Sequence, residues 1–200
     1  REALAGLPPR VPFHPTARRD FERATQAPFT GEALPPLLCA GLPAKADERY
    51  RSEHFAPVLL EVPLPAETTT AWLDAATGFV RDHVYGALSA YVFAPRTIRN
   101  EHRAAIDRAV VRLPHGTIAI NTWTGLGYGL GTTPWGAPPD AAPEHGRGWA
   151  HGTSCLGSVQ RTVIEAPFRP RPLPPWLPQH RRGEATLRAL CRYYLAPNPL

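Results

Sequence analysis

Several residue types that carry specific chemistry are scarce in this sequence. Its three cysteines, Cys39, Cys155 and Cys191, are too widely spaced for a disulfide framework or a zinc-binding pattern. No apolar run approaches the roughly 18 residues that a membrane-spanning helix needs, and no signal-peptide core is visible. These absences argue against a disulfide-stapled domain and a membrane protein, and they favour a cytoplasmic location.

Methionine is absent and Lys45 is the only lysine. Since an open reading frame ordinarily begins with methionine, we expect the 200 residues to be part of a longer chain. Arginine supplies nearly all of the positive charge, and the formal net charge is +5. Such a charge is typical of nucleic-acid-binding proteins, but here the basic residues are scattered and form no patch with interleaved aromatics. We therefore expect no nucleic-acid partner.

Proline, by contrast, is abundant, with 25 residues that mark the organisation of the chain. Because proline lacks an N–H group, its clusters predict extended connections rather than helices or central strands. The clusters lie at residues 7–15, 34–43, 134–143 and 167–178. The chain is expected to divide into a proline-rich, partly helical lead-in (1–50), an α/β segment (51–140) and a tail (141–200).

The α/β segment alternates between strand-like and helix-like patterns. Strands are predicted at 58–64, 88–93 and 117–121, the second of them buried, and amphipathic helices at 65–84 and 99–113. Two strand–helix–strand units in succession predict right-handed crossovers and a parallel sheet. In such a sheet, ligands gather at the carboxyl ends of the strands.

Outside this segment the patterns are shorter. A helix is predicted over 16–25, a strand over 158–165, and a terminal helix over 183–195 with Leu187, Leu190 and Tyr194 on one face. The glycine-rich run at 125–131 follows a predicted strand, as a phosphate-binding loop would. The following residues do not form a helical pattern, so the run is interpreted as a flexible active-site loop.

His145, His151 and Cys155 are of residue types that bind metal ions, and His151 and Cys155 are four residues apart. Glycines intervene throughout, so no helix places these side chains on one face. The spacing therefore predicts no metal site.

Four short segments resemble motifs of the aldehyde dehydrogenase superfamily, and they occur in the family's order. They are residues 53–59 (Glu-His-Phe-Ala-Pro-Val-Leu), 85–93 (Tyr-Gly-Ala-Leu-Ser-Ala-Tyr-Val-Phe), 116–121 (Gly-Thr-Ile-Ala-Ile-Asn) and 133–137 (Thr-Pro-Trp-Gly-Ala). The sequence thus resembles the C-terminal part of the family's catalytic domain, in a divergent bacterial branch. The resemblance implies an NAD- or NADP-dependent oxidoreductase that converts an aldehyde to a carboxylic acid. It also implies a homo-oligomer in the intact protein, with the strand and helix of the tail serving oligomerisation.

The resemblance assigns roles to four residues. Glu53 would accept hydrogen bonds from the nicotinamide ribose, and Phe55 would pack near the nicotinamide ring. The alternative for Glu53 is a solvated carboxylate without a ligand, and the alternative for Phe55 is ordinary core packing. Asn121 and Trp135 would line the substrate channel, although an asparagine at a strand end more commonly satisfies turn backbone.

The family's nucleophile and cofactor-binding domain are not found in this chain. In the family, the catalytic cysteine lies N-terminal to the motif at 53–59. Cys39 stands in an apolar context and is interpreted as a small buried hydrophobe. We therefore expect no catalytic residue in this piece, no activity from it alone, and poor solubility because sheet faces would be uncovered. The alternative is a non-catalytic remnant or scaffold that keeps the fold.

Overall fold

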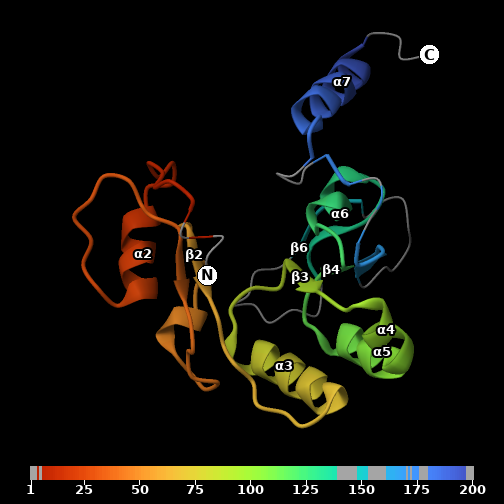
Figure 1. Ribbon diagram of the computed structural model, residues 1–200, viewed down its shortest axis with the longest axis horizontal. Coiled ribbons are helices and arrows are strands. Elements are labelled where there is room, and N and C mark those ends of the chain that lie inside the picture. The colour runs from red at the N-terminus through yellow and green to blue at the C-terminus, as the bar shows by residue number, and fades with distance from the viewer. Residues whose placement is uncertain are drawn as a thin grey trace.

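The computed structural model describes residues 4, 6–138, 148–152, 161–169, 171, 173–175 and 180–196 of the chain. The described strands form a parallel pair β1-β2, a parallel sheet of order β3-β4-β7 and an antiparallel pair β5-β6. The prediction of an α/β fold with parallel strands is confirmed. Figure 1 shows α2 and β2 on one side, the β3-β4-β7 sheet with its helices on the other, and α3 between them.

The N-terminal part is built on α2 (Ala17–Thr25), β1 (Leu37–Cys39), the short 3-10 helix η1 (Glu48–Tyr50) and β2 (Val58–Leu60). The prediction of a helix over 16–25 is confirmed, and its apolar face packs with Leu34 in a small core. The predicted strand at 58–64 is shorter and ends at Leu60. Its partner β1 was not predicted, because three residues flanked by prolines show no periodicity.

The helix predicted at 65–84 is α3 (Thr69–His83). Thr68 caps it, since its Oγ1 accepts a hydrogen bond of 3.1 Å from the Ala71 N–H. Gly86, beyond the end of the helix, has a φ of 106°. A positive φ is open to glycine because it has no Cβ, and the chain turns there into the next strand.

The three-stranded sheet has β4 (Thr117–Ile120) at its centre, between β3 (Ser89–Val92) and β7 (Thr162–Glu165). Every residue of β4 is buried. The helix predicted at 99–113 is in fact two helices, α4 (Arg96–Glu101) and α5 (Arg103–Arg112), which meet at His102. The backbone of His102 (φ −122°, ψ 27°) is not helical, so the apolar stripe continues across a break that the pattern does not reveal.

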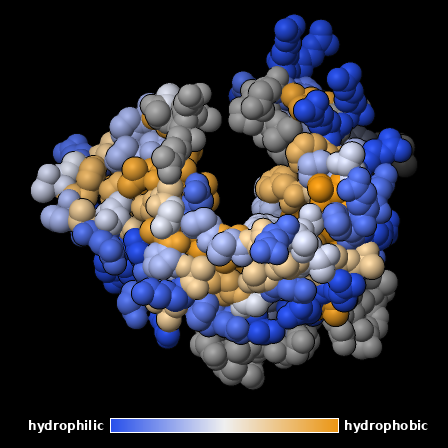
Figure 2. Space-filling view, turned by 60° about the horizontal axis from the view of Figure 1, so that its bottom comes forward, coloured by the Kyte–Doolittle hydropathy of each residue, from blue (hydrophilic) through white to orange (hydrophobic). Residues whose placement is uncertain are grey.

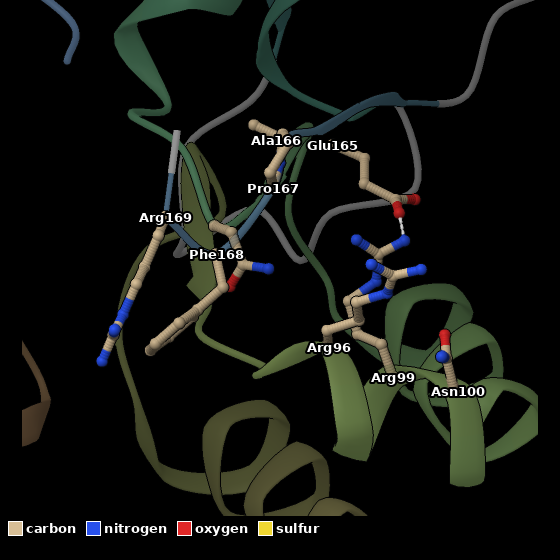
Figure 3. A pocket seen from close by; sticks show the side chains of 9 residues that line it. Arg96, Arg99, Asn100, Glu165, Ala166, Pro167, Phe168 and Arg169 are labelled. Carbon is tan, nitrogen blue, oxygen red and sulfur yellow. Dashed lines mark ion pairs between the residues drawn. The ribbon is translucent and has the colours of Figure 1, made fainter. Parts of the chain in front are cut away.

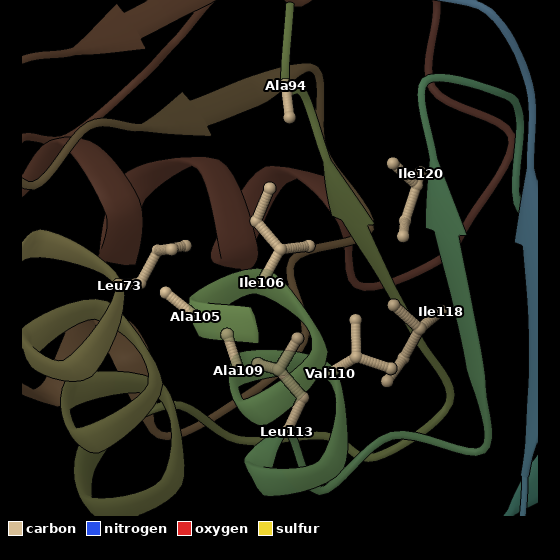
Figure 4. Close-up of a cluster of buried hydrophobic side chains, with 9 residues drawn as sticks. All are labelled: Leu73, Ala94, Ala105, Ile106, Ala109, Val110, Leu113, Ile118 and Ile120. Atoms are coloured by element: carbon tan, nitrogen blue, oxygen red, sulfur yellow. The ribbon is translucent and has the colours of Figure 1, made fainter. Parts of the chain in front are cut away.

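The main core lies between α3, α5 and β4. Figure 4 shows the side chains of α5 directed toward β4, with Val110 against Ile118. The buried cluster consists of Leu73, Ala94, Ala105, Ile106, Ala109, Val110, Leu113, Ile118 and Ile120.

The strand predicted at 88–93 is present as β3, but the prediction that it is buried is wrong. Leu88, Tyr91 and Phe93 are 47%, 44% and 70% exposed. Since β3 is an edge strand, one side of it is left open by the described elements.

The glycine-rich run interpreted as a flexible loop is instead a short helix, α6 (Gly125–Gly129). Gly127 is buried because its Cα lies close to the side chain of Thr117 in β4. After α6 come β5 (Trp135–Ala137) and β6 (Gly148–His151), which pair with each other.

The tail keeps two predicted elements. Of the strand predicted over 158–165, Thr162–Glu165 form β7, which pairs along one edge with β4 of the same chain, whereas 158–160 lie outside the described residues. The terminal helix is α7 (Gly183–Leu195), which extends away from the body (Figure 1). Its expected apolar residues Leu187, Leu190 and Tyr194 are 40%, 46% and 75% exposed. Among the described residues, no helix combines the length and apolar composition of a membrane span.

Candidate functional site

A cavity of about 690 Å³ opens at the carboxyl ends of β4 and β7. Its lining comes from α4, from the residue after β4 and from the end of β7 with the segment that follows (Figure 3). The lining residues are Arg96, Arg99, Asn100, Asn121, Glu165, Ala166, Pro167, Phe168 and Arg169. Small-molecule sites have volumes of roughly 300–1,000 Å³ and gather at this edge of parallel sheets. Position and size therefore make this cavity the candidate site.

Asn121 lines the cavity, and its side chain is hydrogen-bonded to backbone groups of Ala94. Its Oδ1 accepts from the Ala94 N–H and its Nδ2 donates to the Ala94 carbonyl, both at 2.9 Å. The residue is 7% exposed and has a φ of 58°, a left-handed conformation that asparagine tolerates. Such contacts are typical of an asparagine at a strand end that satisfies backbone groups. Because both amide atoms already have a partner, the side chain has little hydrogen-bonding capacity left for a ligand.

Arginine dominates the charge of the cavity. Arg99, whose side chain is 24% exposed, forms an ion pair with Glu165. Figure 3 shows the guanidinium groups of Arg96 and Arg99 next to each other below the Glu165 carboxylate. Arg96 and Arg169 have no hydrogen-bond or ion-pair partner within the part of the chain that the structure describes. The lining thus contains three guanidinium groups and one carboxylate, which pairs with Arg99 alone, so the cavity is positively charged and favours anions.

Glu53 and Phe55 lie elsewhere, on the loop between η1 and β2. The carboxylate of Glu53 is exposed, and its backbone carbonyl accepts a hydrogen bond of 3.3 Å from Arg23. Phe55 is 42% exposed and stacks on His14, with ring centroids 4.0 Å apart and an interplanar angle of 14°. Neither residue lines the cavity at β4 and β7.

A buried carboxylate that the sequence analysis missed holds this loop. Asp20 is 2% exposed and accepts hydrogen bonds from the Thr16 hydroxyl at 2.6 Å, from Arg23 at 2.7 Å and from the Phe55 N–H at 3.3 Å. Burial alone would raise the pKa of Asp20. The hydrogen bonds from Thr16 and Phe55, with the charges of Arg23 and Arg19, outweigh burial and hold its pKa below the ordinary 3.8.

The sequence did contain a signal for Asp20. It lies on the apolar face of the helix predicted at 16–25, three residues after Ala17 and four before Ala24. A carboxylate in such a position must find partners when the face is buried, because an unpaired buried charge is very costly.

Trp135 occupies a third place. It begins β5 and forms an edge-on contact with Tyr128, with ring centroids 5.9 Å apart. The next residue, Gly136, packs its carbonyl against Gly116, which precedes β4. Asn121 follows β4, so Trp135 and Asn121 lie toward opposite ends of that strand. The four residues singled out from the sequence are thus distributed over three regions.

The cysteines are not part of the cavity. Cys39 is half-buried, and its Sγ donates to the Ala24 carbonyl at 3.5 Å, while Cys191 lies exposed on α7. In the described ranges, no three His, Cys, Asp or Glu side chains are grouped as metal ligands would be. His145 and Cys155, weighed above as metal ligands, lie outside the described residues.

A second concavity, of about 740 Å³, is mainly apolar and lies between α3, β3 and the helices α4 and α5. Trp72, Tyr91 and Phe93 line it and are all substantially exposed. Figure 2 shows hydrophobic surface gathered on the inner side of a hollow in the molecule. Apolar surface of this extent is usually covered by another segment or chain.

Comparison of the chain with protein-family models, with curated proteins and with solved structures finds no match. No relative assigns a role to the cavity or to the loop at Glu53.

Proposed function

We propose that the chain is the C-terminal part of the catalytic domain of an NAD- or NADP-dependent oxidoreductase of the aldehyde dehydrogenase type. One observation carries the proposal. Three of the four motif-bearing segments, 85–93, 116–121 and 133–137, fold against one another. The first two supply the adjacent parallel strands β3 and β4, and Gly136 of the third packs on Gly116 of the second. Motifs that are separate in sequence but assembled in one unit support the resemblance more strongly than isolated matches.

The residues near Glu53 fit the nicotinamide end of such a cofactor. The Glu53 carboxylate is exposed and forms no ion pair within the described residues, so both oxygens are open to a ribose diol. Phe55 offers an exposed aromatic edge, and Asp20 fixes the backbone of its loop. When bound, the dinucleotide would accept hydride from the substrate. This chain's contribution would be to hold the ribose and to shape the apolar surroundings.

In the intact protein the aldehyde would be attacked by a cysteine thiolate, and water would later release the carboxylic acid. Cys39 does not suit that role, because it is half-buried and donates to a helix carbonyl. The chain by itself is therefore proposed to be inactive, and the intact enzyme to be a homo-oligomer.

The test starts from the reading frame that contains this chain. It should encode a cysteine roughly 100 residues before Glu53 and a glycine-rich dinucleotide-binding segment. The protein expressed from that frame should reduce NAD or NADP when supplied with aldehydes. A frame without that cysteine, or a protein that reduces neither nucleotide with any aldehyde, would contradict the proposal.

A matched pair of variants tests the role of Glu53. Glu53→Gln should raise the KM for the nucleotide about tenfold, since a charged hydrogen bond is worth roughly 1.5–3 kcal/mol. Glu61→Gln changes another exposed glutamate, directly after β2, and should leave the KM unchanged. Equal KM values in the two variants would remove Glu53 from the cofactor site.

The alternative function is a scaffold that keeps the fold without the chemistry. It is favoured by the separation of the loop at Glu53, Asn121 and Trp135 into three regions, and by the engagement of the Asn121 amide with backbone. A scaffold predicts no nucleotide binding by the intact protein, measurable by calorimetry with NAD and NADP. Nucleotide binding that Glu53→Gln weakens would exclude it.

A further inference from the structure

The arginine-lined cavity at the ends of β4 and β7 is not used by the function proposed above. Its lining contains three arginines and a single acidic residue, Glu165. That excess of positive charge in a concave site attracts anions.

Two of the arginines are held close together by the helix itself. Arg96 and Arg99 are three residues apart on α4, a spacing that places side chains on one face. Like charges at this spacing repel, and the chain offers only partial relief, because Glu165 pairs with Arg99. Figure 3 shows the Arg96 guanidinium beside this pair. A second anion placed at Arg96 would complete the neutralisation.

The rest of the lining is suited to an organic ligand rather than to a bare ion. Phe168 is 42% exposed, and Pro167 precedes it. Figure 3 shows the Phe168 ring extending between Arg169 and the two arginines of α4. At about 690 Å³ the cavity is large enough for a small molecule with a ring or short chain.

We propose that this cavity binds a small organic anion whose carboxylate or phosphate group sits at Arg96 and Arg99. The planar guanidinium fork matches both groups, because it presents two parallel N–H donors to two oxygens. The apolar or aromatic body of the ligand lies against Phe168, and Arg169 adds positive charge on the other side of the ring. The inference does not depend on the oxidoreductase proposal, since it concerns binding by residues that proposal leaves unused.

The test is calorimetric titration of the full chain with three related probes. Phenyl phosphate and benzoate carry the two candidate anionic groups on the same ring, and benzyl alcohol is the neutral comparison. Binding of either anion at least tenfold tighter than that of benzyl alcohol supports the proposal, and the tighter of the two identifies the preferred group. Equal binding of all three probes would overturn it.

Substitutions locate the site. Arg96→Gln should weaken anion binding about tenfold, and the double change Arg96→Gln with Arg169→Gln should weaken it further. Arg108→Gln removes an exposed arginine on α5 that does not line the cavity, so it should leave binding unchanged. If Arg108→Gln weakens binding as much as Arg96→Gln, binding depends on the net charge of the protein, and the anion does not bind in this cavity.

Glu165 provides a change in the opposite direction. Glu165→Gln removes the internal carboxylate that occupies Arg99, so anion binding should become several-fold tighter. Circular dichroism checks that each variant is folded, and Arg96→Lys, which keeps the charge but loses the fork, should bind phenyl phosphate with intermediate affinity. Unchanged or weaker binding by folded Glu165→Gln would contradict the proposed position of the anion.

Discussion

The side-chain amide of Asn121 lies against the backbone of Ala94, donating to its carbonyl and accepting from its N–H at 2.9 Å each. The Asn121 N–H also donates to the Val92 carbonyl at 2.9 Å. The side chain thus extends the β3–β4 pairing by one step beyond the last strand residues. It joins the two strand ends at the corner of the arginine-lined cavity.

Two substitutions of Asn121 should separate the contribution of its side-chain hydrogen bonds from that of its left-handed backbone conformation. Asn121→Gly keeps the left-handed backbone but removes the side chain, and we expect unfolding free energy to fall by about 2–3 kcal/mol, because two buried backbone groups lose partners. Asn121→Ala should cost about 1 kcal/mol more, since alanine disfavours a φ of 58°. Urea denaturation of the purified variants measures both values. A glycine variant as stable as the parent would show that the amide bonds contribute nothing net.

The contact between Gly116 and Gly136 should be intolerant of any side chain. A Cβ at Gly116 would overlap the Gly136 carbonyl oxygen, and both partners are backbone. Gly116→Ala should therefore destabilise the protein by about 3 kcal/mol or more, as overpacking and backbone shifts do. Gly78→Ala is the control, because α3 leaves open space at Gly78 and alanine there should stabilise by about 0.5–1 kcal/mol. Similar unfolding midpoints for the two variants would contradict the packing.

Stability should fall in acid because two carboxylates have lowered pKa values. Hydrogen bonds from Thr16 and Phe55 hold the pKa of Asp20 below 3.8 despite its burial, and hydrogen bonds from Arg49 hold that of Asp47 at about 2. A group whose pKa is lower in the folded state adds stability above its unfolded pKa. That stability is lost as the pH falls through the folded pKa.

We therefore expect the unfolding free energy to be steady above pH 5 and to decline between about pH 4 and pH 2. Asp20→Asn should be less stable at pH 7 by about 1–3 kcal/mol and should show a shallower decline, because its share is already lost. Thr16→Ala should give a smaller change of the same kind, since it removes one of the hydrogen bonds to Asp20. Urea titrations at pH 7, 4 and 3 provide the measurement. If the unfolding free energy of Asp20→Asn falls in acid as steeply as that of the parent, Asp20 does not contribute to the pH dependence of stability.

The open apolar concavity should make the isolated chain self-associate. Tyr91 and Phe93 stack with ring centroids 5.7 Å apart, and Phe93 is 70% exposed among other apolar residues. Phe93→Ser should lower light scattering at a given concentration, because it interrupts the patch. Val111→Ser, which removes an apolar side chain that is 71% exposed but outside the concavity, should change scattering little. If both variants lower light scattering equally, self-association depends on general surface hydrophobicity and not on the concavity.

Much of the local structure followed from sequence patterns. The helices α2, α3 and α7 lie where the sequence predicted helices. The parallel order of β3 and β4 followed from the helical stretch between them, because a crossover of that length brings the second strand back in the same direction. These features depend on residues close together in the chain.

The candidate site was less accessible to prediction. The run at 125–131 was interpreted as a loop, yet it contains the short helix α6, in which Gly127 lies close to Thr117. The strand β1 is defined by its pairing with β2, a contact between segments some twenty residues apart. Arg96 and Arg99 belong to α4 and Arg169 to the segment after β7, so nothing in the sequence brings the third arginine to the other two.

The sequence by itself therefore determined the α/β class and most helices, because periodicity and caps act within a few residues. Only the tertiary structure decided which groups bind the buried Asp20 carboxylate, which strand face is left open and which arginines share a cavity. Those outcomes depend on contacts between distant segments. The pairing of Arg99 with Glu165 is one such contact. The parallel pairing of β7 with β4 brings the end of β7, which carries Glu165, close to Arg99 of α4.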